Sequence, residues 1–370
     1  MQRDTVRQLI AAIQNVDRTV QAEDRHIPLL LDKLVPVEKY SRARLFHHMS
    51  RQEPALFHSC RVPLRAEGET RALLLQYLRN SVLTDATASV RVGPSRARRR
   101  LRVREIADRW GRGRAVLGIT DLHIRETEMG GLIDTRALRD FNVLLCGSSE
   151  MQVQEMLTLV ISTKDYFTDS HSDDPDGNNH CFVGTKLWLM WETFEGLSRG
   201  LEDAERVKVC GQCRFDLDAF LDLKSSRWLT ISEGQTLFLP GNLTHKVYTL
   251  EHYLGVGAFY VGLPNCIQTL ARWIEHGPLW SLGDRNGQHG NLLDEITDAV
   301  IAKVHETRHS TVRVRRKWGL PELEHAIQAW NRHKRREANG QLLRDPRFAR
   351  LLHSLTSAPY RSHPGAIPPE

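Results

Sequence analysis

The chain has 370 residues, 41% of them hydrophobic, and it carries a formal net charge of +6 with a pI near 9.1. This length allows one large domain with helical additions or two domains. No apolar stretch is long enough to span a membrane, and the N-terminus is charged from its third residue, which argues against a membrane span and a signal peptide. Six cysteines over this length do not make a disulfide framework, so we expect an intracellular protein, cytoplasmic rather than nuclear.

Much of the positive charge lies in two runs, residues 95–114 and 313–336. Such runs attract nucleic acid, acidic proteins or phosphorylated ligands, and they also occur as solvated faces or as helices whose arginines pair with local acids. No recognised nucleic-acid motif or interleaved set of aromatic residues accompanies these arginines. The charge therefore leaves a nucleic-acid partner open without a motif to support it.

Helical patterns dominate both ends of the chain. In the first 114 residues we expect helices near 3–21, 41–51, 70–80 and 101–110, with short extended pieces at 54–59 and 86–92. The pattern after Pro264 predicts helices at 265–276, 291–306 and 320–336. The apolar stripes of these last helices require a partner surface, either on the β core or on a second subunit.

The central part consists of apolar runs bounded by glycine, proline and asparagine. They predict strands at 115–124, 141–147, 156–163, 181–192, 227–232, 235–241, 245–250 and 253–263. Successive short strands indicate an antiparallel sandwich or barrel, so the predicted fold is a mainly β jelly roll with α additions. The chain then divides into a helical or mixed N-terminal region (1–114) that packs on the barrel, a core (115–263), a C-terminal helical region (264–356) and a disordered, proline-rich tail (357–370).

The segment FTDSHSDDPDGNNHCFVGTKLWLMWE (167–192) begins with acids, amides and two histidines and ends as an apolar strand. An EF-hand calcium loop is the first interpretation to test, because it carries acids at alternate positions before a glycine. With Gly177 in the glycine position, the first ligand would be Ser172 and the closing glutamate would be Val183. Both ends of the loop are missing, so the calcium interpretation is rejected.

A different metal site fits the same segment. His171 and Asp173 are two residues apart, so in an extended segment both side chains leave the same face. His245 begins a predicted strand after a turn at Pro240 and Gly241, and it offers a third ligand. Two histidines and one carboxylate form the facial triad of non-haem Fe(II), which leaves positions open for an oxidant and O₂.

Lys186 extends this site. Strand alternation places it on one face with Trp188 and Met190, and a lysine in such a strand is costly unless it meets an anion. The dicarboxylate 2-oxoglutarate would satisfy the set, with its keto-acid end on iron and its distal carboxylate on Lys186 and the hydroxyl of Thr168. The alternative is a solvated loop followed by an edge strand whose lysine snorkels to water.

Three segments resemble the JmjC family of Fe(II)- and 2-oxoglutarate-dependent oxygenases. They are TDSHSD (168–173), GTKLW (184–188) and PGNLTHKVYTL (240–250), and the resemblance extends over roughly the predicted β core, residues 115–263. The chain departs from the family on a late strand, where many members carry an asparagine in a GGNF stretch and this chain has Gly257-Ala258-Phe259.

The resemblance implies a role for each of five residues. By it, His171, Asp173 and His245 would bind Fe(II), Thr168 and Lys186 would bind 2-oxoglutarate, and O₂ would be the second cosubstrate. It also implies a cupin-like double-stranded β-helix, in agreement with the strand pattern. Relatives commonly dimerise through helices that follow the barrel, which makes a homodimer through the C-terminal helices an expectation here.

The activity implied is that of a dioxygenase which hydroxylates a side chain of a protein or peptide. Hydroxylation of an N-methyl group would give demethylation by the same chemistry. A hydroxylase of a free small molecule, such as an amino acid or a biosynthetic intermediate, is the alternative. A non-catalytic cupin-type binding protein is disfavoured, because all five site positions are filled.

Substrate contacts are expected close to these ligands. Asp174, Asp176, Asn178 and Asn179 lie in a polar loop that would border the site and bind a cationic or hydrogen-bonding group, although simple turn chemistry explains the same composition. Trp188 and Tyr248 are the aromatic candidates, and aromatic residues on such strands are more often core.

Cys210 and Cys213 form a CxxC pair. Two incidental reduced cysteines are the simpler interpretation, and half of a structural zinc site, with His180 and Cys181 as partners, is the alternative.

Overall fold

The computed structural model describes residues 22–58, 60, 87–92, 97–112, 116–124, 157–173, 176–201, 215–241, 243–266, 288–308 and 310–322, with isolated positions elsewhere. The elements predicted at 70–80 and 141–147, the tail, and most of the helices predicted at 3–21, 265–276 and 320–336 lie outside these residues. Within the described helices, none is both long and apolar enough to cross a membrane.

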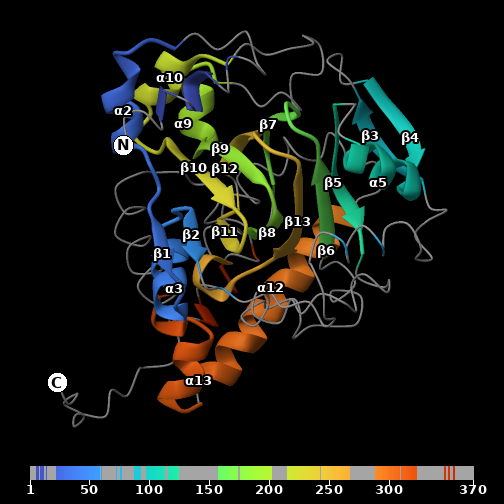
Figure 1. Ribbon diagram of the computed structural model, residues 1–370. Helices are drawn as coiled ribbons and strands as arrows, with labels where there is room; N and C mark the ends of the chain where they lie inside the picture. The colour runs from blue at the N-terminus through green and yellow to red at the C-terminus, as the bar shows by residue number, and fades with distance from the viewer. Residues whose placement is uncertain are drawn as a thin grey trace.

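Thirteen strands of the described chain form two sheets (Figure 1). In chain order they are β1 (Val37–Lys39), β2 (Ala55–His58), β3 (Thr87–Val92), β4 (Ala97–Arg102), β5 (Leu117–His123), β6 (Leu157–Ser162), β7 (Phe167–Ser172), β8 (Asp176–Val183), β9 (Thr185–Glu192), β10 (Arg227–Ser232), β11 (Gln235–Leu239), β12 (Leu243–Thr249) and β13 (Tyr253–Tyr260). The nine-stranded sheet has the order β1-β2-β11-β8-β13-β6-β5-β3-β4, and the four-stranded sheet has the order β10-β9-β12-β7. Only the β1–β2 pair is parallel among the pairings of the described strands.

The two sheets face each other across one hydrophobic cluster. Val160 and Leu237 of the larger sheet pack there with Trp188, Leu229 and Val247 of the smaller one. Successive side chains of a strand point to opposite faces, so the neighbours of these residues face outward. Each strand of the smaller sheet thus has an inner face toward the nine-stranded sheet and an outer face toward helices.

Helices cover the outer face of the smaller sheet and the far end of the molecule (Figure 1). The α-helices whose two ends lie within the described residues are α2 (His26–Asp32), α3 (Arg42–Ser50), α5 (Val103–Arg112), α9 (Thr193–Ser198), α10 (Leu217–Asp222), α12 (Gln288–Arg308) and α13 (Val312–Lys317). Side-chain caps define four of their starts, at Ser41, Glu192, Asp216 and Thr311. For α9 and α10, the carboxylates of Glu192 and Asp216 accept from the backbone N–H groups of Glu195 (2.7 Å) and Ala219 (3.1 Å). In Figure 1, α12 and α13 lie at the opposite end from α2 and α10.

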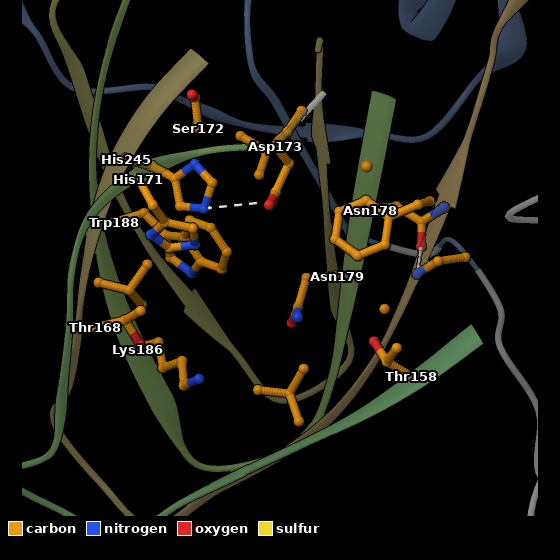
Figure 2. Close-up of a pocket in the computed structure, with 17 residues that line it drawn as sticks. Thr158, Thr168, His171, Ser172, Asp173, Asn178, Asn179, Lys186, Trp188 and His245 are labelled. Carbon is orange, nitrogen blue, oxygen red and sulfur yellow. Dashed lines mark hydrogen bonds and ion pairs between the residues drawn. The ribbon is translucent and has the colours of Figure 1, made fainter. Parts of the chain in front are cut away.

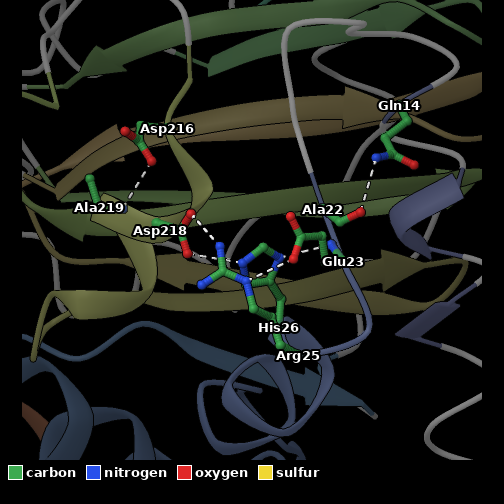
Figure 3. A network of polar contacts seen from close by, with 8 residues as sticks. All are labelled: Gln14, Ala22, Glu23, Arg25, His26, Asp216, Asp218 and Ala219. Atoms are coloured by element: carbon green, nitrogen blue, oxygen red, sulfur yellow. Dashed lines mark hydrogen bonds and ion pairs between the residues drawn. The ribbon is translucent and has the colours of Figure 1, made fainter.

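A polar network attaches the N-terminal part to the outer layer (Figure 3). The Glu23 N–H donates to Nδ1 of the buried His26 at 2.9 Å, so Nε2 carries the hydrogen and donates to Asp218 on α10 at 2.9 Å. Arg25 reaches the other oxygen of Asp218 at 3.1 Å. Because both ring nitrogens of His26 are engaged, this histidine and carboxylate join α2 to α10 and leave no free nitrogen for chemistry.

The coarse fold prediction is confirmed: the chain is mainly β-sheet with helical additions. The helices predicted near 41–51, 101–110 and 291–306 occur as α3, α5 and α12. The described strands form two sheets and no closed barrel. The proposed boundaries at 114/115 and 263/264 stay predictions, although β1 to β4 of the first 114 residues pair into the nine-stranded sheet.

The strand predicted at 181–192 is wrong as a single element. It is the end of β8 and the whole of β9, which belong to different sheets. The chain turns between them at Gly184, whose φ is +85° and where a Cβ would lie 2.2 Å from the carbonyl oxygen of His252. Only glycine tolerates both this backbone angle and this close approach, so Gly184 sets the point at which the apolar run divides into β8 and β9.

Candidate metal centre

The predicted metal ligands meet at the inner face of the smaller sheet (Figure 2). His171 on β7 and His245 on β12 are register partners, and their ring centroids lie 4.2 Å apart. Asp173 follows the end of β7, with its carboxylate oxygen 3.7 Å from Nε2 of His245. One ligand atom from each of the three residues lies within 4.8 Å of the other two, so the fold assembles the group that the spacing predicted.

Backbone carbonyls orient both histidines. Nδ1 of His171 lies 2.7 Å from the carbonyl oxygen of Asp169, and Nδ1 of His245 lies 3.1 Å from that of Leu243. A carbonyl only accepts, so each Nδ1 carries the hydrogen and each Nε2 keeps its lone pair. Metal-binding histidines are commonly held in this way, with the second nitrogen donating to a carbonyl or carboxylate.

Burial shifts the pKa values of His245 and Asp173 in directions that favour the binding of a cation. His245 is 3% exposed, and burial together with the neighbouring His171 holds its pKa well below the usual range. Burial raises the pKa of Asp173, while His171 opposes that rise. A neutral histidine is ready to bind a metal, and a divalent cation would offset the desolvation of the carboxylate. The donor set therefore fits a divalent metal such as Fe(II).

A cavity of about 340 Å³ opens beside these ligands, between the two sheets. This volume is in the range of small-molecule sites. We call it the main cavity, and Figure 2 shows the side chains around it. The sequence-predicted residues that line it are Thr168, His171, Asp173, Asn178, Asn179, Lys186, Trp188 and His245.

Thr168 reaches the cavity through a β-bulge. It precedes His171 by three residues, and strict alternation would place the two side chains on opposite faces. The β7–β12 register shifts between the pairs His171–His245 and Thr168–Val247, so three steps on β7 face two on β12. The extra residue turns Thr168 back to the inner face, where it lines the cavity.

Lys186 brings a cation into the cavity without a counter-charge. Its side chain is 2% exposed, and its ammonium lies 4.4 Å from the centre of the Tyr253 ring. Within the described part of the chain it makes no hydrogen bond or ion pair. Burial lowers its pKa to about 7. A buried amine in this state is stabilised by any anion that enters the cavity.

Two asparagines of β8 complete the wall opposite the ligands. The Tyr253 hydroxyl donates to Oδ1 of Asn179, which leaves the Asn179 amide hydrogens for a ligand. Oδ1 of Asn178 accepts from the backbone N–H of Ala258 at 3.1 Å. The sequence predicts Asn179 at the entrance of the site, as part of a loop over 174–179, whereas it belongs to β8, which begins at Asp176. Tyr253 is not among the predicted site residues.

Two tentative substrate residues lie elsewhere, and these predictions are corrected. Asp176 is fully buried and does not line the cavity; its carboxylate accepts from Gly241 N (2.9 Å), Gly262 N (2.9 Å) and the side-chain amide of Asn265. Tyr248 faces outward by alternation and stacks on Phe167 in the outer cluster. Asp174 lies outside the described residues.

The substitution Asp176→Asn is expected to cost about 3 kcal/mol of unfolding free energy. Asparagine keeps the size but offers one oxygen, so at least one buried donor loses its acceptor and the charge-assisted bonds are lost. Urea unfolding measures this cost, and Asp222→Asn on the exposed end of α10 is the matched control. Unchanged unfolding free energy, or lost metal affinity in a fully stable variant, would contradict the structural role.

The structure describes only some of the residues named in the cysteine predictions. Cys210 and Cys213 lie outside the described residues. Of their suggested partners, His180 bonds through Nδ1 to Thr236 Oγ1 at 2.8 Å, and the Cys181 thiol donates to the Gly184 carbonyl at 3.2 Å. Among the residues that the structure describes, the His171, Asp173 and His245 group is the one that could hold a metal ion.

No protein-family model matches the chain, and no curated protein matches it.

Proposed function

We propose that this protein is an Fe(II)- and 2-oxoglutarate-dependent oxygenase that hydroxylates a side chain of a protein or peptide. One observation carries the proposal: a two-histidine, one-carboxylate group and an uncompensated buried lysine share one cavity. The first is the ligand set of non-haem Fe(II) oxygenases. The second requires an anion, and a 2-oxo dicarboxylate would bridge the two.

The strand order supports the assignment to a double-stranded β-helix. The strands β6 to β9 alternate between the larger and the smaller sheet, and so do β10 to β13. In the larger sheet β6, β13, β8 and β11 are neighbours, and in the smaller sheet β7, β12, β9 and β10 are neighbours. Two interlocked antiparallel coils of strands have this pattern, which agrees with the JmjC-like segments.

Each residue of the cavity has a part in holding the reactants. His171, Asp173 and His245 would hold iron and leave positions open on the cavity side. Lys186, with the hydroxyl of Thr168, would bind the distal carboxylate of 2-oxoglutarate. The Trp188 ring lies 5.1 Å from the His245 ring, and Trp188 is 7% exposed. It would therefore keep water from that side of His245. When bound, iron would supply the oxidising chemistry by coupling decarboxylation of 2-oxoglutarate to oxidation of a C–H bond.

The late strand β13 lacks the asparagine that many JmjC members carry, and Asn179 on the neighbouring strand β8 offers an amide close to it. Gly257 of β13 is the register partner of Asn179, and a Cβ on Gly257 would lie 3.7 Å from the Asn179 amide nitrogen. We infer that Asn179 donates to the cosubstrate from the neighbouring strand, in place of an asparagine on β13.

Succinate formation tests the proposed function. Protein reconstituted with Fe(II) under anaerobic conditions is mixed with 2-oxoglutarate and O₂, and succinate is measured with and without peptide mixtures. We expect succinate that requires Fe(II) and increases when a substrate is present. The Zn(II)-loaded protein is the control, because zinc takes the same ligands without redox chemistry. An absence of Fe(II)-dependent succinate under every condition would refute the proposal.

A further inference from the structure

A second cavity of about 410 Å³ lies beside the metal centre, and we call it the side cavity. Its floor includes Met190 and Leu243, which are 1% and 6% exposed. One wall is the turn 51–54 that leads into β2, and another is formed by Lys224, Ser225 and Arg227 before and at the start of β10.

Strand register places the side cavity in line with the metal ligands. Arg227 is the partner of Met190 on β9, and Met190 is the partner of His245 on β12. Register partners share a face, and Met190 belongs to the inner cluster, so Arg227, Met190 and His245 form one row across the inner face. Two strand spacings separate Arg227 from His245, which is about 10 Å. Arg227 therefore lies on the same face as His245, with Met190 between them.

The acids of the side cavity are already engaged. The Glu195 carboxylate accepts from the backbone N–H groups of Lys224 at 2.7 Å and Ser225 at 2.9 Å. Glu192 caps α9 by accepting from Glu195 N at 2.7 Å. Glu53 pairs with Arg51 at 3.1 Å. These three carboxylates therefore already accept hydrogen bonds or an ion pair from groups of the cavity walls.

Arg227 and Lys224 are the cations of the side cavity that no carboxylate pairs with among the described residues, and Arg227 is the one on the inner face in line with His245. Its guanidinium donates through Nη1 to the carbonyl oxygens of Lys224 (2.9 Å) and Ser226 (2.7 Å). No carboxylate pairs with it within the described part of the chain. These two bonds fix the plane of the guanidinium and leave Nε and Nη2 for a ligand. Planar paired donors of this kind match a carboxylate.

The turn 51–54 that lines the side cavity contains a residue with positive φ. Gln52 has a φ of +58°, which is rare for a residue other than glycine. Its side-chain amide donates to Oδ1 of Asn265 at 3.0 Å, and Asn265 donates in turn to the buried carboxylate of Asp176. This φ belongs to the cap that ends α3, in which the N–H groups of Gln52 and Glu53 donate to the carbonyl oxygens of Met49 and His48, both at 3.0 Å.

We propose that the side cavity binds a carboxylate of the substrate through Arg227. The inference rests on the proposed function, because it treats the side cavity as the place where the non-reacting part of the substrate is held. It narrows the substrate class to molecules that carry a carboxylate remote from the oxidised carbon, because the backbone positions of Arg227 and His245 are two strand spacings, about 10 Å, apart. An acidic side chain of a peptide and a free amino acid both carry this group.

Titration with three probes tests the proposal. The probes are the blocked tripeptides Ac-Gly-Glu-Gly-NH₂ and Ac-Gly-Gln-Gly-NH₂ and free L-glutamate. All titrations use the full chain with Lys186→Met, so that the cation of the main cavity does not bind the probes. We expect a carboxylate probe to bind and Arg227→Gln to weaken it by at least about tenfold, because two charge-assisted bonds are lost. Binding of the tripeptide alone would identify a peptide substrate, and binding of glutamate alone a free amino acid.

Two further variants keep the test decisive. Arg199→Gln removes the same charge at the exposed end of α9, outside the side cavity, and is expected to change nothing. Arg227→Lys keeps the charge but loses the paired donors, and it is expected to bind with intermediate affinity. The proposal is overturned if neither carboxylate probe binds, if the glutamine peptide binds equally well, or if both Arg227 variants bind as the parent does. Failed succinate formation in the wild-type chain would refute the proposed function instead, since the titrations require no turnover.

Discussion

The substitution Lys186→Met is expected to stabilise the empty protein by a few kcal/mol and to weaken 2-oxoglutarate binding by at least about 100-fold. Burial lowers the pKa of Lys186 from 10.5 to about 7, so the folded protein disfavours the ammonium that the unfolded chain holds freely. This destabilisation is fully present below pH 7 and disappears as the pH rises toward 10.5. Methionine fills similar space without the charge, but it cannot bind a carboxylate. Urea unfolding and calorimetric titration measure the two effects.

Lys246→Met is the matched control for this substitution. Lys246 is also 2% exposed, but it is on the outer face of β12, where its ammonium lies 5.2 Å from the centre of the Phe167 ring and 4.0 Å from the carboxylate of Asp169. Its replacement should leave 2-oxoglutarate affinity within about threefold of wild type, because it does not line the main cavity. Equal 2-oxoglutarate affinities in wild type and Lys186→Met would remove Lys186 from the cosubstrate site.

Wild-type affinity should also depend on pH in a way that identifies Lys186. The dicarboxylate binds the protonated amine, whose pKa in the empty protein is about 7. The dissociation constant is therefore expected to be flat below pH 7 and to rise by about tenfold per pH unit above it. Lys186→Met should lack this dependence.

His245→Ala is expected to lower the affinity for Fe(II) or Zn(II) by at least about 100-fold. The substitution removes one of three ligands that converge within 4.8 Å, and the two that remain cannot occupy a face of an octahedral metal. His180→Ala is the control, since His180 is also buried, at 5% exposed, and bonds to Thr236 through Nδ1. The control should lose stability and keep its metal. Wild-type metal affinity in His245→Ala would contradict the proposed centre.

The metal ligands could be predicted because their signals are local. His171 and Asp173 share a face by alternation alone, and Lys186 stands out as a charge in an apolar strand. The same alternation rule places Tyr248 on the outer face, three residues after the inward His245, so the sequence itself argues against Tyr248 as a site residue.

Other parts of the site depend on contacts that the sequence does not display. The bulge that turns Thr168 inward depends on pairing with β12. The polar stretch that begins at Asp176 has loop composition, yet it forms β8 between β11 and β13, and distant groups at Gly241, Gly262 and Asn265 hold the Asp176 carboxylate. The alignment of Arg227 with the metal ligands follows only from the register of β10 on β9, which the sequence does not give.

Anomalous diffraction tests the central claim most directly. Crystals of the protein would be soaked anaerobically with Fe(II) and 2-oxoglutarate, and data would be collected on both sides of the iron absorption edge. We expect one iron peak within about 2.2 Å of the Nε2 atoms of His171 and His245 and an oxygen of Asp173. We also expect 2-oxoglutarate to extend from iron to the ammonium of Lys186. Iron bound elsewhere, or a 2-oxoglutarate that does not reach Lys186, would contradict the account.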